Sequence, residues 1–130
     1  ELAIVKNYLA LEQIRFEDRL EVRFEIDADT LKQPIPPMML QTLVENAIKH
    51  GISQSVKGGE VVIVSDFVAD HHEIRVQNTG QLKAGAIEEG FGISSTRNRL
   101  HLLFGNKAGF SIGNLDNQRV AATVLLPVML

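Results

Sequence analysis

The residues best suited to chemistry in this chain lie at 44–50, which read Val-Glu-Asn-Ala-Ile-Lys-His and are followed by Gly51. Asn46 and Lys49 are three residues apart, so a helix would place both on one side and apolar residues on the other. The amide oxygen of Asn46 is a hard, neutral ligand suited to Mg²⁺, and the Lys49 ammonium can reach a phosphate. On spacing alone, an ordinary solvated helix face explains the pattern better.

A second candidate is the segment 78–80, Asn-Thr-Gly, which follows a predicted strand. Asn78 can both donate to and accept from the edge of a nucleotide base, and Gly80 lets a ligand approach the backbone closely. Asn and Gly are also common where a strand ends in a turn, and that explanation is the better one for this segment taken alone.

A third candidate is Gly90-Phe91-Gly92, which leads into a predicted helix. Free N–H groups at a helix N-terminus bind anions, and glycine permits close approach. Ser95 could cap the helix or bond to phosphate, and Arg97 and Arg99 add positive charge. A hinge before a normally capped helix is the better explanation for this segment taken alone.

The bulk composition limits the other possibilities. The chain has 130 residues, which suits one domain (1–130) with one core, and its net charge of −3 predicts no general attraction to nucleic acid. No apolar run approaches the roughly 20 residues that span a bilayer, so we expect no direct membrane contact by this fragment. The first residue is Glu1 and not Met, which suggests a fragment of a longer protein.

Periodicity predicts the elements that position these residues. Helices are expected over 1–17, 36–50 and 93–104, and strands over 19–27, in a hairpin at 60–78, and over 109–113 and 119–127. This order predicts an α+β two-layer sandwich, a mixed but mostly antiparallel sheet with three helices on one face. Residues 80–92 are expected to form a flexible loop.

The sequence also predicts which side chains are buried. The apolar arc of the first helix comprises Leu2, Ile4, Val5, Tyr8, Leu9, Leu11 and Phe16, and that of the third comprises Ile93, Leu100, Leu103 and Phe104. The continuous run Val61–Val64 is typical of a central strand covered on both faces. His71, His72 and His101 lack metal-binding spacing, and we expect them to be solvated.

Taken together, the motifs resemble the catalytic, ATP-binding domain of sensor histidine kinases, within the GHKL superfamily (Bergerat fold), and most closely its LytS-like branch. The segments that carry the resemblance are 8–16 (YLALEQIRF), 35–37 (IPP), 43–51 (LVENAIKHG), 78–80 (NTG), 90–100 (GFGISSTRNRL) and 122–127 (ATVLLP). The match spans nearly the whole chain. The segments 43–51 and 90–100 are highly specific in combination.

The resemblance implies a role for each matching residue. Asn46 would ligate Mg²⁺, Lys49 would lie near the phosphates, and His50 would replace an aromatic residue near the nucleotide. Asn78 and Gly80 would contact adenine, 81–91 would form the mobile ATP lid, and Gly90 and Gly92 would cradle phosphates. Arg97 and Arg99 match basic positions after the lid.

Four positions depart from the family pattern. Asn78 stands where the superfamily has Asp, which predicts adenine binding weaker by roughly 1–2 kcal/mol because the hydrogen bond loses its charge. Ala122-Thr123 replaces a Gly-Thr pair, with Thr123 expected at the nucleotide, and Ser95 replaces an Asn. Thr42 occupies the position, four residues before Asn46, where hydrolytic relatives carry a water-activating Glu.

The resemblance therefore implies a two-component sensor kinase domain that binds Mg-ATP and donates the γ-phosphoryl to a His in an upstream dimerisation domain. It also implies a response-regulator partner, a homodimeric full-length protein, and a cytoplasmic domain of a parent anchored in the bacterial inner membrane. Two alternatives remain. One is a non-catalytic interaction or dimerisation module, which Asn78 and Ala122 favour. The other is a hydrolytic ATPase, against which Thr42 argues.

Overall fold

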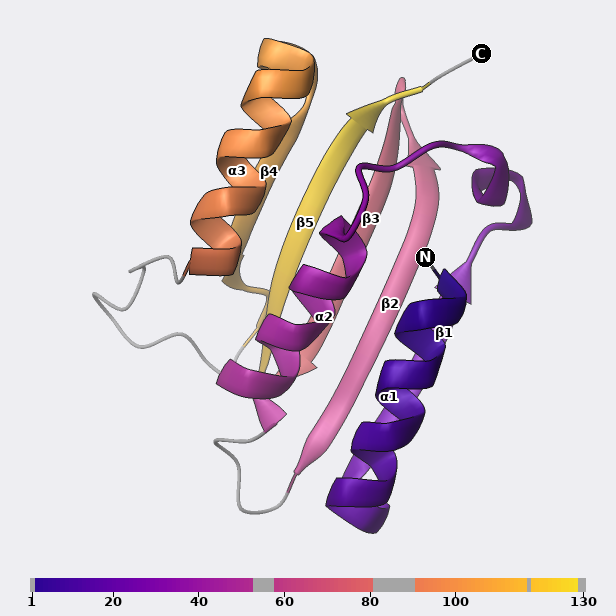
Figure 1. Ribbon diagram of the computed structural model, residues 1–130, viewed down its shortest axis with the longest axis vertical. Coiled ribbons are helices and arrows are strands. Elements are labelled where there is room, and N and C mark those ends of the chain that lie inside the picture. The colour runs from indigo at the N-terminus through magenta and orange to yellow at the C-terminus, as the bar shows by residue number, and fades with distance from the viewer. Residues whose placement is uncertain (1, 53–57, 81–90, 117, 129–130) are drawn as a thin grey trace.

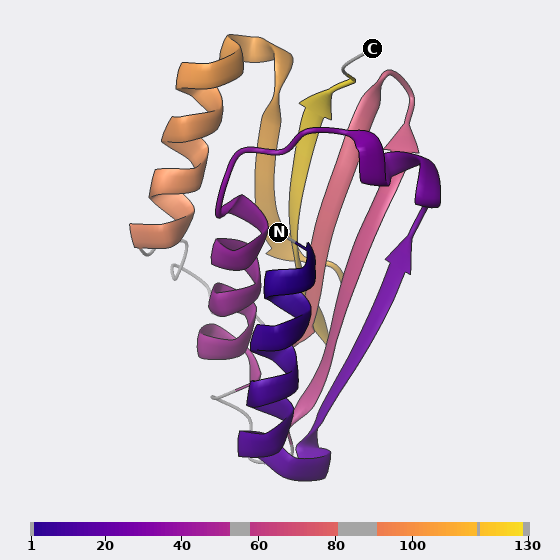
Figure 2. The same cartoon turned by 45° about the vertical axis from the view of Figure 1, so that its right-hand side comes forward.

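Three helices form one layer over one face of a five-stranded sheet (Figures 1 and 2). The computed structural model describes residues 2–52, 58–80, 91–116 and 118–128, with only the backbone at 91–93. The helices are α1 (Leu2–Phe16), α2 (Met39–His50) and α3 (Phe91–Phe104). This architecture confirms the predicted α+β two-layer sandwich, and α2 lies between the other two helices (Figure 1).

The sheet is mixed, as predicted, and runs in the order β1-β2-β3-β5-β4. Its strands are β1 (Leu20–Ile26), β2 (Gly59–Val68), β3 (His71–Thr79), β4 (Gly109–Asn114) and β5 (Arg119–Pro127). Only the β1–β2 pair is parallel among these strands, and the 60–78 hairpin forms as β2 and β3. The C-terminal end of β3 lies at the C-terminal end of α2, which brings two of the candidate segments together.

The core lies between the two layers. Alternation along the strands turns one side of each strand toward the helices, where Val61, Ile63, Ile74, Val76 and Val124 are almost fully buried. The helices meet them with Val5 and Leu9 of α1 and with Leu43, Val44 and Ile48 of α2. Packing of this inner surface fixes the height and rotation of α2 over the sheet.

The opposite face of the sheet corrects one expectation. Val62 and Val64 are buried, but no described helix covers them, contrary to the two-sided cover that the apolar run suggested. Their cross-strand neighbours are the long polar side chains of Arg23 and Gln77 beside Val62, and of Glu25 and Arg75 beside Val64. The aliphatic parts of such side chains can cover apolar neighbours while their polar ends stay in water.

Helix boundaries and apolar arcs also differ from prediction. The second helix begins at Met39 and not at Pro36, because Met38 adopts a left-handed conformation (φ 68°) that a right-handed helix cannot include. Ile4 and Leu11 of α1 are 53% and 66% exposed, and Leu103 of α3 is 56% exposed. The predicted arcs were too wide, because each helix buries only the narrow face that touches the sheet or α2.

His72 was wrongly expected to be solvated. It is 2% exposed on the inner face of β3, and its Nε2 lies 2.8 Å from the Ser65 hydroxyl. Ser65 donates to Thr30 Oγ1 at 2.7 Å, and Thr30 donates to the Asp27 carbonyl. Ser65 must then accept from an Nε2–H of His72, which leaves the buried Nδ1 without a partner. His72 belongs to a buried polar chain at the end of the sheet remote from Asn78.

Candidate functional site

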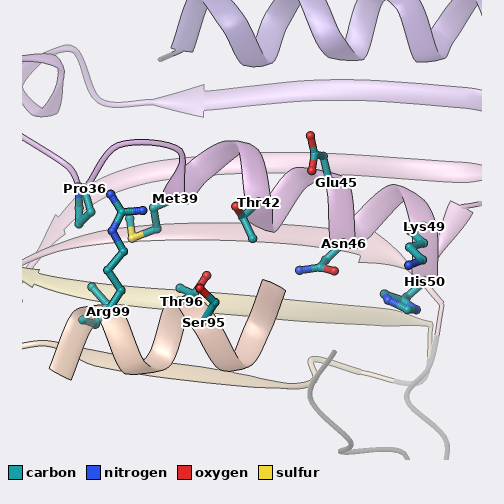
Figure 3. Close-up of a pocket in the computed structure, with 11 residues that line it drawn as sticks. Pro36, Met39, Thr42, Glu45, Asn46, Lys49, His50, Ser95, Thr96 and Arg99 are labelled. Atoms are coloured by element: carbon teal, nitrogen blue, oxygen red, sulfur yellow. The ribbon is translucent and has the colours of Figure 1, made fainter. Parts of the chain in front are cut away.

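The outward side of α2 carries the candidate residues. Helical spacing places Thr42, Asn46 and Lys49 on the side facing α3 because the opposite side packs into the core (Figure 3). Thr42 donates its hydroxyl to the Met38 carbonyl at 2.8 Å, which ties it to the irregular start of the helix. Of the polar residues predicted to cluster on this helix face, Thr42, Asn46 and Lys49 do so, whereas Glu45 points elsewhere.

A cavity of about 410 Å³ lies between α2 and α3. The residues that line it are Pro36, Met39, Thr42, Glu45, Asn46, Lys49, His50, Ser95, Thr96, Arg99 and Leu100. Buried Met39 and Leu100 supply apolar surface, while Lys49 and Arg99 supply positive charge. An apolar floor with a few converging polar groups is the usual form of a small-molecule site.

Asn46 carries the most direct sign of a missing ligand. The Nδ2 atom of its side chain is buried and has no hydrogen-bond partner. Leaving a buried polar group unpaired costs about 1–3 kcal/mol, so such atoms in native proteins usually serve a ligand or water. No group of three or more His, Asp or Glu residues among the described residues could hold a metal ion. The Nδ2 group is a donor and suits a phosphate oxygen, whereas Mg²⁺ would be held by Oδ1 of the same amide, because Mg²⁺ binds through one or two protein oxygen ligands together with phosphates and waters.

The two ends of the cavity differ in character. Arg99 extends from α3 toward Pro36 and Met39, whereas Lys49 and His50 lie at the other end of α2 (Figure 3). Both cations contribute to the lining, so an elongated anion placed along α2 would meet positive charge at each end. Thr96, which is 6% exposed, and the exposed Ser95 add hydroxyl groups between these ends.

Glu45 does not neutralise this charge in the cavity. Its side chain points away from α3 (Figure 3), and it accepts a hydrogen bond from Gln41 Nε2 at 3.0 Å. The effect of Glu45 on Tyr8 of α1 indicates the same orientation of the Glu45 side chain. Burial raises the pKa of Tyr8 first, and the negative charges of Glu12 and Glu45 raise it further. Glu45 therefore faces Tyr8, although it directly precedes Asn46 in sequence.

Asn78 lies below the cavity and not in its lining. It is 7% exposed, and its Nδ2 donates to the Thr79 carbonyl at 3.0 Å. The side chain fills the space that Gly51 leaves open, because a Cβ added to Gly51 would collide with Asn78 Nδ2. Gly80 lies beside both residues with a φ of 141°, which glycine alone adopts easily. These segments meet at the end of α2, as the resemblance implied.

Two other predicted residues lie away from the cavity. Arg97 stacks over the Phe110 ring, 5.1 Å from its centroid, and donates to the Phe110 carbonyl at 3.4 Å. Thr123 pairs with Arg75 on the face of the sheet opposite the helices, since its neighbours Ala122 and Val124 point into the core. The inner-face residue of β5 that pairs with Asn78 is Val120.

The remaining predicted residues lie at the edge of what is described. Gly90 lies outside the described residues, as do residues 81–90 of the lid expected at 81–91. Gly92 belongs to the first turn of α3, which begins at Phe91 and approaches the Asn46 half of the cavity (Figure 3). A phosphate group at this end of the cavity would therefore lie near the positive end of the α3 dipole.

Sequence reasoning missed several residues of the site. Pro36, Met39, Thr96 and Leu100 line the cavity, and Gly51 leaves the space that the Asn78 side chain fills. A usable signal existed for Met39, which precedes Thr42 and Asn46 by helical spacing on the same side of α2. The contribution of Thr96 and Leu100 depends on how α3 packs against α2, which spacing within one helix does not reveal.

Known proteins resemble this chain in sequence and in fold, although no family model matches it. Sensor histidine kinase BtsS of Escherichia coli K12 is 33% identical over 128 residues, covering 98% of this chain and 23% of that protein. Sensor protein LytS of Enterococcus faecalis is 32% identical over 129 residues, covering 89% of this chain and 22% of that protein. The catalytic domain of histidine kinase ThkA superposes with a TM-score of 0.69 at 18% identity, covering 93% of this chain and 88% of that one.

The fold is thus that of histidine kinase catalytic domains. Its sequence relatives are sensor histidine kinases, and the chain is a LytS-like member of that family. The chain spans about a quarter of the length of these curated relatives. Among the described residues, no helix is long and apolar enough to cross a membrane.

Proposed function

We propose that this chain is a single catalytic domain that binds Mg-ATP in the cavity between α2 and α3. The observation that carries the proposal is the buried and unpaired Nδ2 donor of Asn46, in a cavity of about 410 Å³ that Lys49 and Arg99 also line. Lys49 and Arg99 would orient the phosphate chain and offset its charge, while His50 would lie at the end of the cavity nearest Asn78 and Gly80. Bound Mg²⁺ would neutralise phosphate charge and align the γ-phosphoryl group.

The acceptor in this proposal is a His of an upstream dimerisation domain in a homodimeric, full-length sensor kinase. The γ-phosphorus would lose its bond to the bridging oxygen of ADP and gain one to an imidazole nitrogen. This domain's contribution would be positioning and charge neutralisation. Thr42 supports transfer over hydrolysis, because its hydroxyl donates to the Met38 carbonyl and cannot act as the carboxylate base of a hydrolase.

The partner of the longer parent protein is inferred from a kinase of similar structure. The histidine kinase ThkA has been solved in complex with its response regulator, and that kinase resembles this chain with a TM-score of 0.68 at 19% identity. We infer that the longer protein to which this chain belongs also binds a response regulator. The domain would act on the cytoplasmic side of the inner membrane in which we expect the parent to be anchored, since ATP is available there.

Calorimetric titration with ATP and Mg²⁺ tests the proposal. Wild-type protein should bind saturably, and Asn46→Ala should weaken binding at least about tenfold while leaving the thermal melt unchanged. Gln41→Ala is the matched control, because Gln41 lies on the same helix but outside the cavity lining. Chelation of Mg²⁺ should reduce wild-type affinity toward that of Asn46→Ala.

A second candidate function has one specific observation in its favour. Asn78, which should meet adenine, is buried and hydrogen-bonded to its own chain, as suits a non-catalytic interaction module. Absence of saturation at millimolar ATP with Mg²⁺ would support that module and refute the kinase proposal. Rapid turnover of ATP by the isolated chain would instead support a hydrolytic ATPase.

A further inference from the structure

The connection between β1 and α2, residues 27–38, crosses over one end of the sheet (Figures 1 and 2). We call this connection the strap. It begins with a short 3₁₀ helix at Ala28–Lys32 and continues with Pro34, Pro36 and Pro37. Proline fixes φ, so a segment rich in proline is stiff and passes a displacement at one end on to the other. The strap therefore links whatever holds its first half to whatever its second half touches.

A buried polar chain holds the first half of the strap. Thr30, which is 3% exposed, donates its hydroxyl to the Asp27 carbonyl at 2.6 Å and accepts the Ser65 hydroxyl at 2.7 Å. Ser65 lies on β2, and its oxygen is 2.8 Å from Nε2 of the buried His72 on β3. Because Ser65 gives its own hydrogen to Thr30, it accepts from the Nε2–H of a neutral His72. Both strands are thereby joined to the strap through their side chains.

The second half of the strap forms one wall of the cavity. Pro36 is buried and lines the cavity, and its carbonyl accepts the Met39 N–H at 3.2 Å. Met38 lies between them at φ 68°, a conformation that is costly for a residue with a Cβ and persists only where surrounding contacts hold it. The Met38 carbonyl accepts the N–H of Thr42 at 3.0 Å and its hydroxyl at 2.8 Å. The end of the strap thus sets the positions of the lining residues Pro36, Met39 and Thr42.

From this continuity we propose that His72 and Ser65 are positioning residues of the cavity, which act through Thr30 and the strap on Pro36 and Met39. The inference rests on the proposed function, because this wall serves a nucleotide only if the cavity binds one. The arrangement depends on a neutral His72. A proton on Nδ1 would add a charge and a donor to a buried atom that has no hydrogen-bond partner, so the charged ring must leave its buried position. Acid should therefore release the strap and weaken nucleotide binding.

The surroundings of His72 offer no compensation for a proton. Across the sheet, His72 pairs with Phe67 of β2, with ring centroids 6.0 Å apart, and with Leu126 of β5. The charged and titratable groups of the adjoining elements are exposed or lie on the other face of the sheet: Asp27, Asp29, Lys32, Asp66, Asp70, His71 and Glu73. Burial is the cause that lowers the pKa of His72. A group whose pKa is lowered in the closed state binds its proton as that state opens, so protonation and closure of the strap oppose each other below about pH 6.5.

Amide NMR spectra of the chain test the coupling without any ligand. Between about pH 7.5 and about pH 5, the Met39 and Thr42 N–H signals should shift with the midpoint of the His72 imidazole. His72→Gln is the matched variant, because its side-chain amide can still donate to Ser65 but does not titrate. The shift should be absent in His72→Gln, in which any effect of His50 on α2 would persist. Met39 and Thr42 signals that stay in place in the wild type, or that move equally in both proteins, overturn the proposal.

Ser65→Ala interrupts the polar chain at neutral pH and gives an independent readout. This variant should move the Met39 and Thr42 signals, whereas Ser111→Ala, at an exposed position of β4, should leave them in place. Unchanged signals in Ser65→Ala would contradict the positioning role. Circular dichroism melts identify a variant that fails to fold, and His72→Gln then decides.

Calorimetric titration with Mg-ATP extends the test to function. Between about pH 7.5 and about pH 5.5, wild-type affinity should fall at least about fivefold more than that of His72→Gln, since protonation of the nucleotide itself affects both proteins alike. An equal loss in both proteins would refute the inference and leave the nucleotide site standing. Absence of binding by either protein at neutral pH would refute the proposed function instead, and the amide signals would still decide whether His72 positions the cavity wall.

Discussion

Replacing Gly51 by Ala should uncouple the end of α2 from β3. The new Cβ would lie 2.8 Å from Asn78 Cγ and 2.7 Å from the Ala47 carbonyl oxygen, both inside van der Waals contact. The Ala47 oxygen cannot move freely because it accepts the Gly51 N–H at 3.0 Å in the last turn of α2. The collision must therefore be relieved mainly by movement of the Asn78 side chain. This side chain would rotate and lose its hydrogen bond to Thr79.

The magnitude follows from these contacts. Overpacking a tight site costs about 1–3 kcal/mol, and a lost neutral hydrogen bond costs about 0.5–1.5 kcal/mol. Lower entropy of the unfolded chain offsets about 0.4–1 kcal/mol of this when glycine becomes alanine. The net loss should be about 2 kcal/mol, which moves the urea midpoint by about 1 M for a slope near 2 kcal/mol/M.

Urea unfolding followed by circular dichroism measures this loss. Gly113→Ala is the matched control, because a Cβ there meets nothing within 4 Å and β4 tolerates alanine. The double variant Gly51→Ala, Asn78→Ala should recover part of the stability, since truncation of Asn78 removes one of the two collisions. A Gly51→Ala protein as stable as Gly113→Ala would refute the close packing of Asn78 against the end of α2.

Three further outcomes follow from other contacts. Thr42→Glu should raise the ATPase rate of the isolated chain at least about tenfold, because it places a carboxylate that can activate water four residues before Asn46. A phosphate-release assay measures this rate, and an unchanged rate would contradict the prediction. Burial lowers the pKa of His72, so the unfolded state binds the extra proton and the free energy of unfolding should fall as pH drops below about 6.5. His72→Phe should flatten that pH profile, whereas His101→Phe, at an exposed position, should leave it unchanged. Ser65→Ala should cost about 1–3 kcal/mol in urea unfolding by stranding the buried His72 nitrogen, and a value near that of an exposed Ser111→Ala would count against it.

Periodicity and turn chemistry were sufficient for the fold. Strict alternation in 19–27 and the breaks at Gly51 and Gly105 located β1 and the ends of two helices within a residue or two. The start of α2 could not be read in this way, because the left-handed conformation of Met38 has no local sequence signal. Likewise, the burial of His72 depends on its partner Ser65 across the hairpin, and a run of polar residues gave no hint of it.

The site residues likewise fall into those that spacing along one helix predicts and those whose position depends on tertiary packing. Asn46 and Lys49 could be predicted because both lie on one helix, where spacing alone fixes their common direction. Arg97 and Arg99 differ by only two residues, and spacing shows that a helix must point them in different directions. Which of the two reaches the cavity depends on the packing of α3, and the structure places Arg99 in the lining and Arg97 over Phe110. Thr123 was misplaced for a similar reason, since only the strand register shows which face it occupies.

The packing of α2 explains why site and core cannot vary independently. Leu43, Val44 and Ile48 hold one side of the helix against the sheet, so the Asn46 amide on the other side cannot shift along the cavity without disturbing them. At its C-terminal end, Gly51 lets the helix approach Asn78 closely enough to align the two halves of the site. A substitution in the core that tilts α2 should therefore weaken ligand binding even where it touches no cavity residue. Loss of the Asn46 amide alone should weaken binding with little effect on stability, because its Nδ2 donor has no hydrogen-bond partner in the protein to lose.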